Sequence, residues 1–174
     1  PCWMTYKKDF EAIGAFNSNI YPEDYDLAFR FYQGGLECIP SNEILHLWRD
    51  HPERASRNDE HYQDNQFLEL KLTFFLEIER DQSRPLVLWG AGKRGKKLAK
   101  LLIEREIDFF WVSNNSNKIG KNIYGRVIQD VFYSEALEKP QLIIQVSSPF
   151  DQSAIRAYLN AQLLEAIEDY FFFC

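Results

Sequence analysis

The stretch that decides the fold runs from residue 86 to residue 97 and reads LVLWGAGKRGKK. Its first four residues are a short apolar run, of the length that buried strands have. Three glycines, Gly90, Gly92 and Gly95, follow at once, and closely spaced glycines are typical of tight turns. A lysine-rich segment with helical periodicity follows from residue 96 to residue 105. The stretch therefore predicts a buried strand, a tight turn and a helix in direct succession.

The glycine spacing G-x-G-x-x-G, placed between a strand and a helix, is the context that the dinucleotide-binding fingerprint requires. There the glycines let a phosphate approach the backbone, and the helix N-terminus supplies positive potential. Neighbouring basic residues would add charge for an anion: Lys93, Arg94, Lys96 and Lys97. Gly90, Gly92 and Gly95 are therefore candidate cofactor-binding residues.

The end of the next strand departs from the fingerprint. An acid about twenty residues further on usually binds the ribose hydroxyls, but residues 112–115 read VSNN. Asn114 can hydrogen-bond a hydroxyl, although less strongly than a carboxylate because it carries no charge. Asn114 joins the candidates, and three interpretations of the turn stay open: a purely structural turn, a site for a nucleotide or sugar phosphate, and a partner surface.

Further strands are expected at 107–112, 127–129, 141–146 and 170–173, and a further helix at 151–164. Such alternation implies a parallel sheet with helices on its faces. Residues 114–121, with Gly125 after them, resemble a turn found in small Rossmann-like domains appended to transferases and methyltransferases. We therefore predict that 83–174 is a small Rossmann-like α/β domain.

The remainder of the chain is organised differently. Residues 59–80 have the longest helical pattern, with neither Pro nor Gly inside, so 59–82 is predicted to be a long linking helix. Before it, 1–58 is irregular: a helix is expected at 23–33, stopped by the glycines at 34 and 35, and two short extended stretches at 36–39 and 43–48. The expected fold class is α/β, with a mostly helical first part.

The motifs AIGAF at 12–16, PEDYDLAFR at 22–30 and the glycine pair at 34 and 35 resemble the second half of inverting GT-A glycosyltransferases of the family 2 type, over roughly residues 1–71. The resemblance implies that 1–58 is the C-terminal portion of such a domain. It assigns Asp24 as the general base on an acceptor hydroxyl and Glu23 as its support. Acids at a helix start are also ordinary capping residues. Arg30 is expected to pair with an acid of the fold.

Three basic side chains further on, His46, Arg49 and His51, match the loop that closes over the donor diphosphate in this family. There they would stabilise the charge of the leaving phosphate or add a ligand to a bound metal. The alternative is a solvated basic loop.

The family's donor-binding half and its Asp-x-Asp motif are missing here, so Mg²⁺ or Mn²⁺ is expected in the parent domain, with no metal or cofactor in this fragment. Because the chain begins with Pro1, upstream residues are expected in the parent. We therefore predict that the chain is a fragment of a glycosyltransferase of polysaccharide biosynthesis and that the fragment alone is inactive. The parent enzyme would transfer a sugar from a nucleotide-sugar donor to a saccharide or lipid-linked acceptor. The alternative is a non-catalytic Rossmann-like module that binds a nucleotide or a protein. An NAD-dependent oxidoreductase fits less well, because the second strand lacks its acid and no Tyr-x-x-x-Lys pair is found.

Composition sets outer bounds on partners. The 174 residues carry a formal net charge of -6, which disfavours non-specific binding to nucleic acid and to anionic membranes, because both are polyanions. The 3 cysteines are far apart and suggest neither a disulfide framework nor a metal site. The cysteines therefore favour a reducing cytoplasm, and the net charge predicts no nucleic-acid partner. No apolar run approaches the length that spans a bilayer, and a homo-oligomer is compatible with the sequence.

Overall fold

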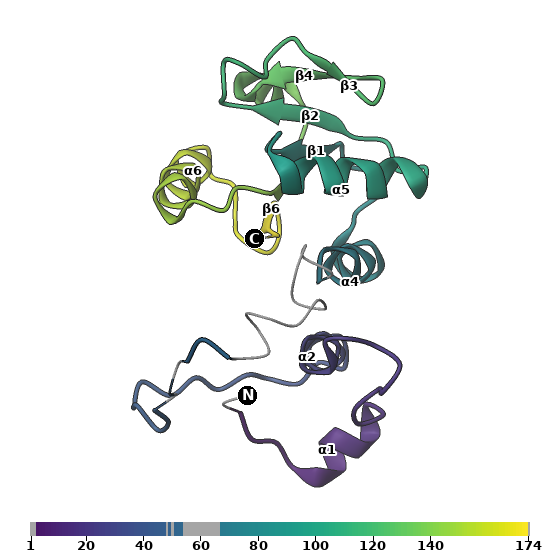
Figure 1. The fold of residues 1–174 in the computed structure, drawn as a ribbon, viewed down its shortest axis with the longest axis vertical. Helices are drawn as coiled ribbons and strands as arrows, with labels where there is room; N and C mark the ends of the chain where they lie inside the picture. The colour runs from purple at the N-terminus through teal and green to yellow at the C-terminus, as the bar shows by residue number, and fades with distance from the viewer. Residues whose placement is uncertain (1–2, 48, 50, 54–66, 174) are drawn as a thin grey trace. The chain divides into compact units, whose positions relative to one another are not determined.

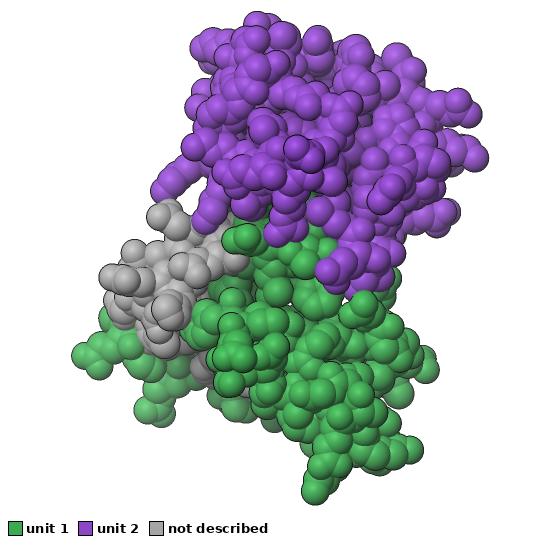
Figure 2. Space-filling model, turned by 90° about the vertical axis from the view of Figure 1, so that its right-hand side faces the viewer, with its two compact units in different colours: residues 1–74 green, residues 75–174 purple. Residues whose placement is uncertain are grey.

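A computed structural model describes residues 3–47, 49, 51–53 and 67–173. The chain divides into two compact units, Pro1–Phe74 and Phe75–Cys174, which Figure 2 distinguishes by colour. The division lies inside the segment that the sequence predicts to link the two parts.

The described helices of the first unit are α1, Lys7–Ala12; α2, Glu23–Gln33; and α4, Phe67–Phe74. The helix expected at 23–33 is confirmed, and it ends where Gly34 begins. The extended stretches expected at 36–39 and 43–48 form no strand within the part that is described, which leaves out residue 48. The reason is physical: Ile39, Ile44 and Leu47 are largely exposed, so neither stretch has the buried face or the neighbouring strand that would hold it in a sheet.

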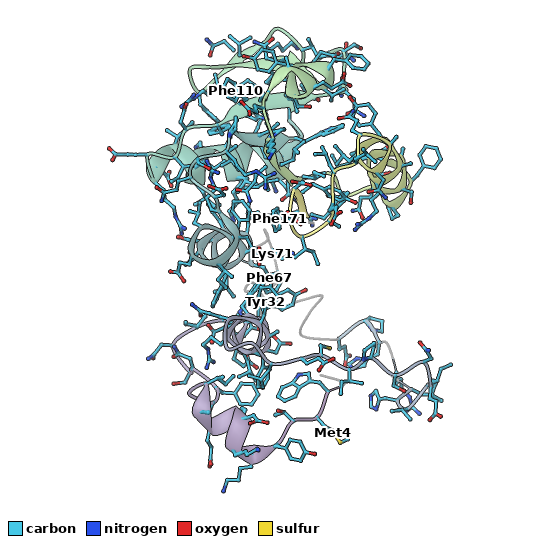
Figure 3. All side chains as sticks on the ribbon, turned by 180° about the vertical axis from the view of Figure 1, so that it is seen from behind. Met4, Tyr32, Phe67, Lys71, Phe110 and Phe171 are labelled. Carbon is cyan, nitrogen blue, oxygen red and sulfur yellow. The ribbon has the colours of Figure 1, made fainter. Side chains whose placement is uncertain are left out.

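Aromatic side chains join α2 to α4 within this unit. The rings of Phe29 and Phe74 stack with centroids 4.7 Å apart, and those of Tyr25 and Phe67 stack at 5.0 Å. The Lys71 ammonium lies 5.8 Å from the centroid of Tyr25. Figure 3 labels Phe67 and Lys71, which both project from α4 towards α2.

Arg30 ties α2 to the loop that precedes it. Its guanidinium lies 2.7 Å from the carboxylate of Asp26, which is buried, and it donates further hydrogen bonds to the carbonyls of Ile13 and Ala15, both at 2.6 Å. The prediction that Arg30 pairs with an acid of the fold is confirmed. Charge-assisted bonds of this kind fix the orientation of the helix relative to the loop.

The expected linking helix is only partly within the described residues, since 59–66 lie outside them. Its described part is α4 followed by a π-helical turn, Phe75–Glu79, which opens the second unit. Phe75 packs edge-on against Phe171 and Phe173, with centroids 4.9 Å and 5.8 Å away. Phe171 is labelled in Figure 3.

The described residues of the second unit form a six-stranded sheet in the order β3-β4-β2-β1-β5-β6. Figure 1 labels β1, β2, β3, β4 and β6 of this sheet. The strands are β1, Leu86–Trp89; β2, Phe110–Ser113; β3, Asn122–Ile123; β4, Arg126–Asp130; β5, Gln141–Ile144; and β6, Tyr170–Phe172. All neighbours are parallel except β3, which pairs with β4 antiparallel. The α/β class is confirmed, but the sheet is mixed instead of purely parallel, because residues 124 and 125 turn the chain straight back and form a hairpin.

Leaving out the short β3, the parallel strands lie in the order third, second, first, fourth, fifth, which is that of the doubly wound Rossmann sheet. Helix α5, Lys93–Glu104, connects β1 to β2, a 3-10 helix, Val131–Ala136, connects β4 to β5, and α6, Pro149–Ala161, connects β5 to β6. Helix α5 begins three residues before the expected position, directly after the second glycine of the turn.

Alternate residues of the strands fill two apolar layers. One face of the sheet packs against α6 and the 3-10 helix through a cluster that includes Val87, Trp89, Val112, Leu142, Ile144, Ile155 and Leu159. On the alternate strand positions, Leu88, Trp111 and Ile143 are fully or almost fully buried. A central strand buried on both faces explains why residues 86–89 are continuously apolar. Within the described residues, no helix is both long enough and apolar enough to cross a membrane.

Candidate functional site

The candidate site lies at the carboxyl ends of β1, β2 and β5. The chain passes from β1 to β2 on one side and later returns to β5 on the other side of β1, so β1 stands at the point where the strand order reverses. Ligands of open α/β sheets bind at that point. A pocket of about 480 Å³ is found there. It is lined by Gly90, Ala91, Gly92, Lys93, Arg94, Ser113, Asn114, Asn115, Lys118, Gln145, Val146, Ser147, Ser148 and Asp151.

Two glycines of the turn are required by packing alone. Gly90 has φ +125°, and a Cβ there would stand 2.5 Å from the carbonyl oxygen of Gln145. A Cβ at Gly95 would stand 2.1 Å from the carbonyl oxygen of Gly90. Helix α5 can approach β1 this closely only because both side chains are absent.

Gly92 differs from the other two glycines. Its φ of −76° suits any residue, and nothing lies within 4 Å of the position that a Cβ would take. Neither strain nor crowding explains a glycine there. Gly92 lines the pocket and is the N-cap of α5, so the open space faces the pocket at the start of the helix.

The charges around the start of α5 oppose its dipole. Carboxylates are the favourable side chains at a helix N-terminus, yet the first turn of α5 has none and Gly92 offers no capping side chain. Lys93 and Arg94 occupy the first two positions, and Arg94 donates a hydrogen bond to the hydroxyl of Ser147 at 3.3 Å. A bound anion would offset this accumulation of positive charge.

The end of β2 presents Asn114 to the same pocket. The hydroxyl of Ser113, which is buried, accepts a hydrogen bond from the amide of Asn115 at 3.1 Å, and the Asn115 side chain accepts one from the amide of Asn117 at 3.0 Å. These two hydrogen bonds fix the conformation of the loop that follows β2. Three predicted residues, Gly90, Gly92 and Asn114, therefore meet in one pocket, whereas Gly95 lies against Gly90 and does not line it.

Gln145, just beyond β5, is a residue that the sequence analysis missed. It is only 4% exposed, it lines the pocket, and neither the nitrogen nor the oxygen of its side-chain amide has a hydrogen-bond partner among the described protein atoms. Buried amides without partners are uncommon and costly. The signal in the sequence was a glutamine directly after the apolar run of a buried strand. Nearby, Ser148 caps α6 by accepting a bond from the Asp151 amide at 3.3 Å.

The candidates of the first unit do not converge in this way. Glu23 and Asp24 lie in the first turn of α2, where the Asp24 carboxylate accepts a hydrogen bond from the amide of Tyr25 at 2.9 Å. His46, Arg49 and His51 are exposed, in described residues that form neither helix nor strand. Nothing in the described part of the chain joins these three to Asp24. No group of three or more potential metal ligands is found among the described residues.

No protein-family model and no curated protein matches the sequence. One solved structure that is similar is a crystal structure of RSP, a Rex-family repressor, with 14% sequence identity and a TM-score of 0.41. The match covers 99% of this chain and 82% of the other.

None of these comparisons returns a glycosyltransferase, and the predictions drawn from the GT-A resemblance are corrected. They are the family 2 type assignment, the transfer of a sugar in polysaccharide biosynthesis, and the nucleotide-sugar and glycan partners. The prediction that the protein has no nucleic-acid partner is withdrawn as well. The physical reason is that acids at a helix start, an arginine one turn on and a glycine stop are local requirements of α2, which here hold the buried Asp26–Arg30 pair. Such a pattern arises in unrelated helices.

Proposed function

We propose that residues 75–174 form a non-catalytic module that binds a nucleotide, with a phosphate of the ligand placed over Gly92 at the start of α5. The observation that carries the proposal is the open position above Gly92. It lies at the switch point of the sheet, beside a helix start whose first turn holds Lys93 and Arg94 and no acid. The free backbone amides of a helix start and the charges of these two cations would favour a phosphate at that position.

The other groups around the pocket suit the remainder of a nucleotide. Asn114 at the end of β2 can hydrogen-bond a ribose hydroxyl, and the unpaired amide of Gln145 can both donate and accept. Nothing at the pocket resembles a proton-transfer machinery: Asp151 is its one carboxylate within the described lining, and its amide takes part in the cap of α6. A binding role therefore accounts for the groups better than a catalytic one.

Thermal unfolding of the full chain with added nucleotide tests the proposal. We expect NAD⁺, NADP⁺ or a nucleoside diphosphate to raise the midpoint, because a ligand at about a hundred times its Kd adds roughly 2.7 kcal/mol of stability. If none of these changes the midpoint or is detected by calorimetric titration, the proposal fails, and the turn is a structural element or a protein contact.

Gly92→Asp separates binding from folding. An aspartate is a favoured N-cap, so it should stabilise the empty protein by about 0.5–1 kcal/mol, and there is room for it. The same carboxylate would repel a phosphate, so nucleotide binding should fall at least a hundredfold. Gly92→Asn is the matched control, since it caps the helix without the charge and should lose less affinity.

A further inference from the structure

A second pocket, of about 500 Å³, adjoins the first. Its lining comprises Ala91, Gly92, Lys93, Lys96, Lys97, Lys100, Lys118 and Tyr124. Four of the lysines are spaced at three and four residues along α5, so they share one face of the helix. Lys118 and Tyr124 come from the chain between β2 and β4. We call this the lysine pocket.

The lysine pocket concentrates positive charge in an acidic protein. All eight of its lining residues are described, five of them are lysines, and none is acidic, although the chain as a whole carries a net charge of -6. Like charges at helical spacing destabilise a helix, and three of the four lysines on α5, Lys93, Lys96 and Lys97, lie in the half of the helix that begins with the positive end of its dipole. The concentration of positive charge in this pocket is favourable for a ligand with several negative charges.

Tyr124 occupies a position where a tyrosine is unusual. Tyr124 and Gly125 join β3 to β4 with φ +54° and +77°, the signs that a type I′ hairpin turn requires. Asn-Gly is the preferred pair there, and a bulky residue with positive φ is strained. The ring stacks over Trp111 at 6.4 Å, and the Lys100 ammonium lies 5.4 Å from its centroid. The strained residue thus forms a wall of the lysine pocket, and strain of this kind is often retained at binding sites.

The two pockets adjoin and share part of their lining: Ala91, Gly92, Lys93 and Lys118 line both. Building on the nucleotide-binding function proposed above, we infer that the ligand carries a phosphomonoester on its ribose in addition to the phosphate over Gly92, and that the lysine pocket binds this second phosphate. The departure at the end of β2 agrees with this: a carboxylate there would bind a free ribose diol and repel a phosphate, and this chain has Asn114, with Lys118 nearby in the shared lining.

Pairs of ligands that differ by one phosphomonoester test the inference on the full chain. NADP⁺ is compared with NAD⁺, and coenzyme A with its dephospho form, by calorimetric titration at fixed salt concentration. We expect the phosphorylated member of at least one pair to bind at least tenfold more tightly, and the pair that responds identifies the ribose position. Affinity for that member should also fall more steeply with salt, because more charge is neutralised.

Lys96→Gln and Lys100→Gln assign the effect to the lysine pocket. Each should reduce the preference for the phosphorylated member at least threefold and leave the affinity of the other member nearly unchanged. Lys121→Gln is the matched control. Lys121 is an exposed lysine between β2 and β3, in the same part of the chain as Lys118 and Tyr124, and it does not line the pocket. This substitution should change neither affinity.

The outcomes distinguish the two proposals. Equal affinities within both pairs would overturn the inference and leave nucleotide binding intact. A preference that survives both lysine substitutions, or that Lys121→Gln reduces equally, would overturn the placement in this pocket. If no nucleotide of any kind binds, the proposed function fails as well.

Discussion

The backbone of Gly95 passes so close to the carbonyl oxygen of Gly90 that a Cβ on Gly95 would stand 2.1 Å from that oxygen. Gly95 is in the first turn of α5, and Gly90 is the first residue after β1. This contact sets how closely the helix approaches the strand, and hence where the start of α5 lies relative to the pocket. The three glycines at fingerprint spacing therefore have different structural roles. Gly90 and Gly95 allow α5 to pack closely against β1, and Gly92 leaves open space at the start of α5.

Gly95→Ala should destabilise the second unit, whereas Gly92→Ala should not. The methyl group at residue 95 meets backbone and cannot move aside, so we expect a loss of at least about 3 kcal/mol, at the upper end for overpacking. At Gly92 the methyl group meets nothing within 4 Å, so the loss should stay below about 1 kcal/mol. Urea unfolding midpoints compare the two variants, and similar losses in both would contradict the packing account.

Gln145→Leu should stabilise the empty protein and weaken nucleotide binding. The side-chain amide is buried and lacks partners among the described protein atoms, and an unsatisfied buried polar group costs about 1–3 kcal/mol. A leucine of similar volume removes that cost, together with any hydrogen bond to the ligand. Thermal midpoints without ligand and calorimetric titration with nucleotide measure both effects. A Gln145→Leu protein that is less stable and binds as tightly as the original would show that the amide is structural.

Arg30→Met should destabilise the first unit by about 3–5 kcal/mol, because it leaves the carboxylate of Asp26 buried without its partner. Hydrogen exchange of the α2 amides is the measurement. Lys7→Met is the matched control: Lys7 pairs with Glu11 at the same helical spacing, but that pair is exposed, so its loss should cost at most about 0.5 kcal/mol. Replacing Asp26 by Leu in the Arg30→Met protein should recover part of the stability, and failure to do so would indicate that the bonds of Arg30 to Ile13 and Ala15 dominate.

Tyr158 should make the stability of the second unit depend on pH in the alkaline range. Burial raises the pKa of its hydroxyl above the ordinary value of 10.0, and its hydrogen bond to the Glu135 carboxylate acts in the same direction. A group whose pKa is raised by folding contributes stability that is fully present below its unfolded pKa and is lost as the pH rises through the folded value. Relative to Tyr158→Phe, the original protein should therefore lose stability above about pH 10.

The measurement for Tyr158 is the difference in Tm between the two proteins from pH 8 to pH 11, with the tyrosinate absorbance recorded in parallel. Tyr133→Phe, at a more exposed tyrosine of the same unit, is the control. A difference in Tm that stays constant across the range would contradict the prediction.

Local pattern predicted much of the second unit. The apolar run at 86–89, the glycines after it and the alternation of short apolar runs with amphipathic segments predicted β1, α5, β2, β4, β5, α6 and β6 to within a few residues. Such elements are predictable because a strand buried on both faces is a continuous run of apolar residues, and a helix buried on one face has apolar residues at helical spacing. The 3-10 helix at 131–136 and the hairpin strand β3 were missed, because each is too short to show a period.

In the first unit, predictions from local sequence pattern were wrong about function and about two strands. The motif of α2 was assigned a transferase function, whereas Asp26 and Arg30 of that motif form an ion pair within the fold. Glu23 and Asp24 lie in the first turn of α2, where acids are favourable. The two extended stretches before residue 49 had apolar residues but no partner strand among the described residues, and a strand depends on its neighbour.

The sequence by itself determined that residues 86–104 form a strand, a glycine turn and a helix, because these depend on contacts between residues close in the chain. Only the tertiary structure decided which of the three glycines is open, that Asn114 and Gln145 reach the same pocket as Gly92, and that five lysines line one pocket together with Tyr124. These relationships join residues far apart in the chain through strand order, and strand order follows from long-range packing that leaves no local period to detect.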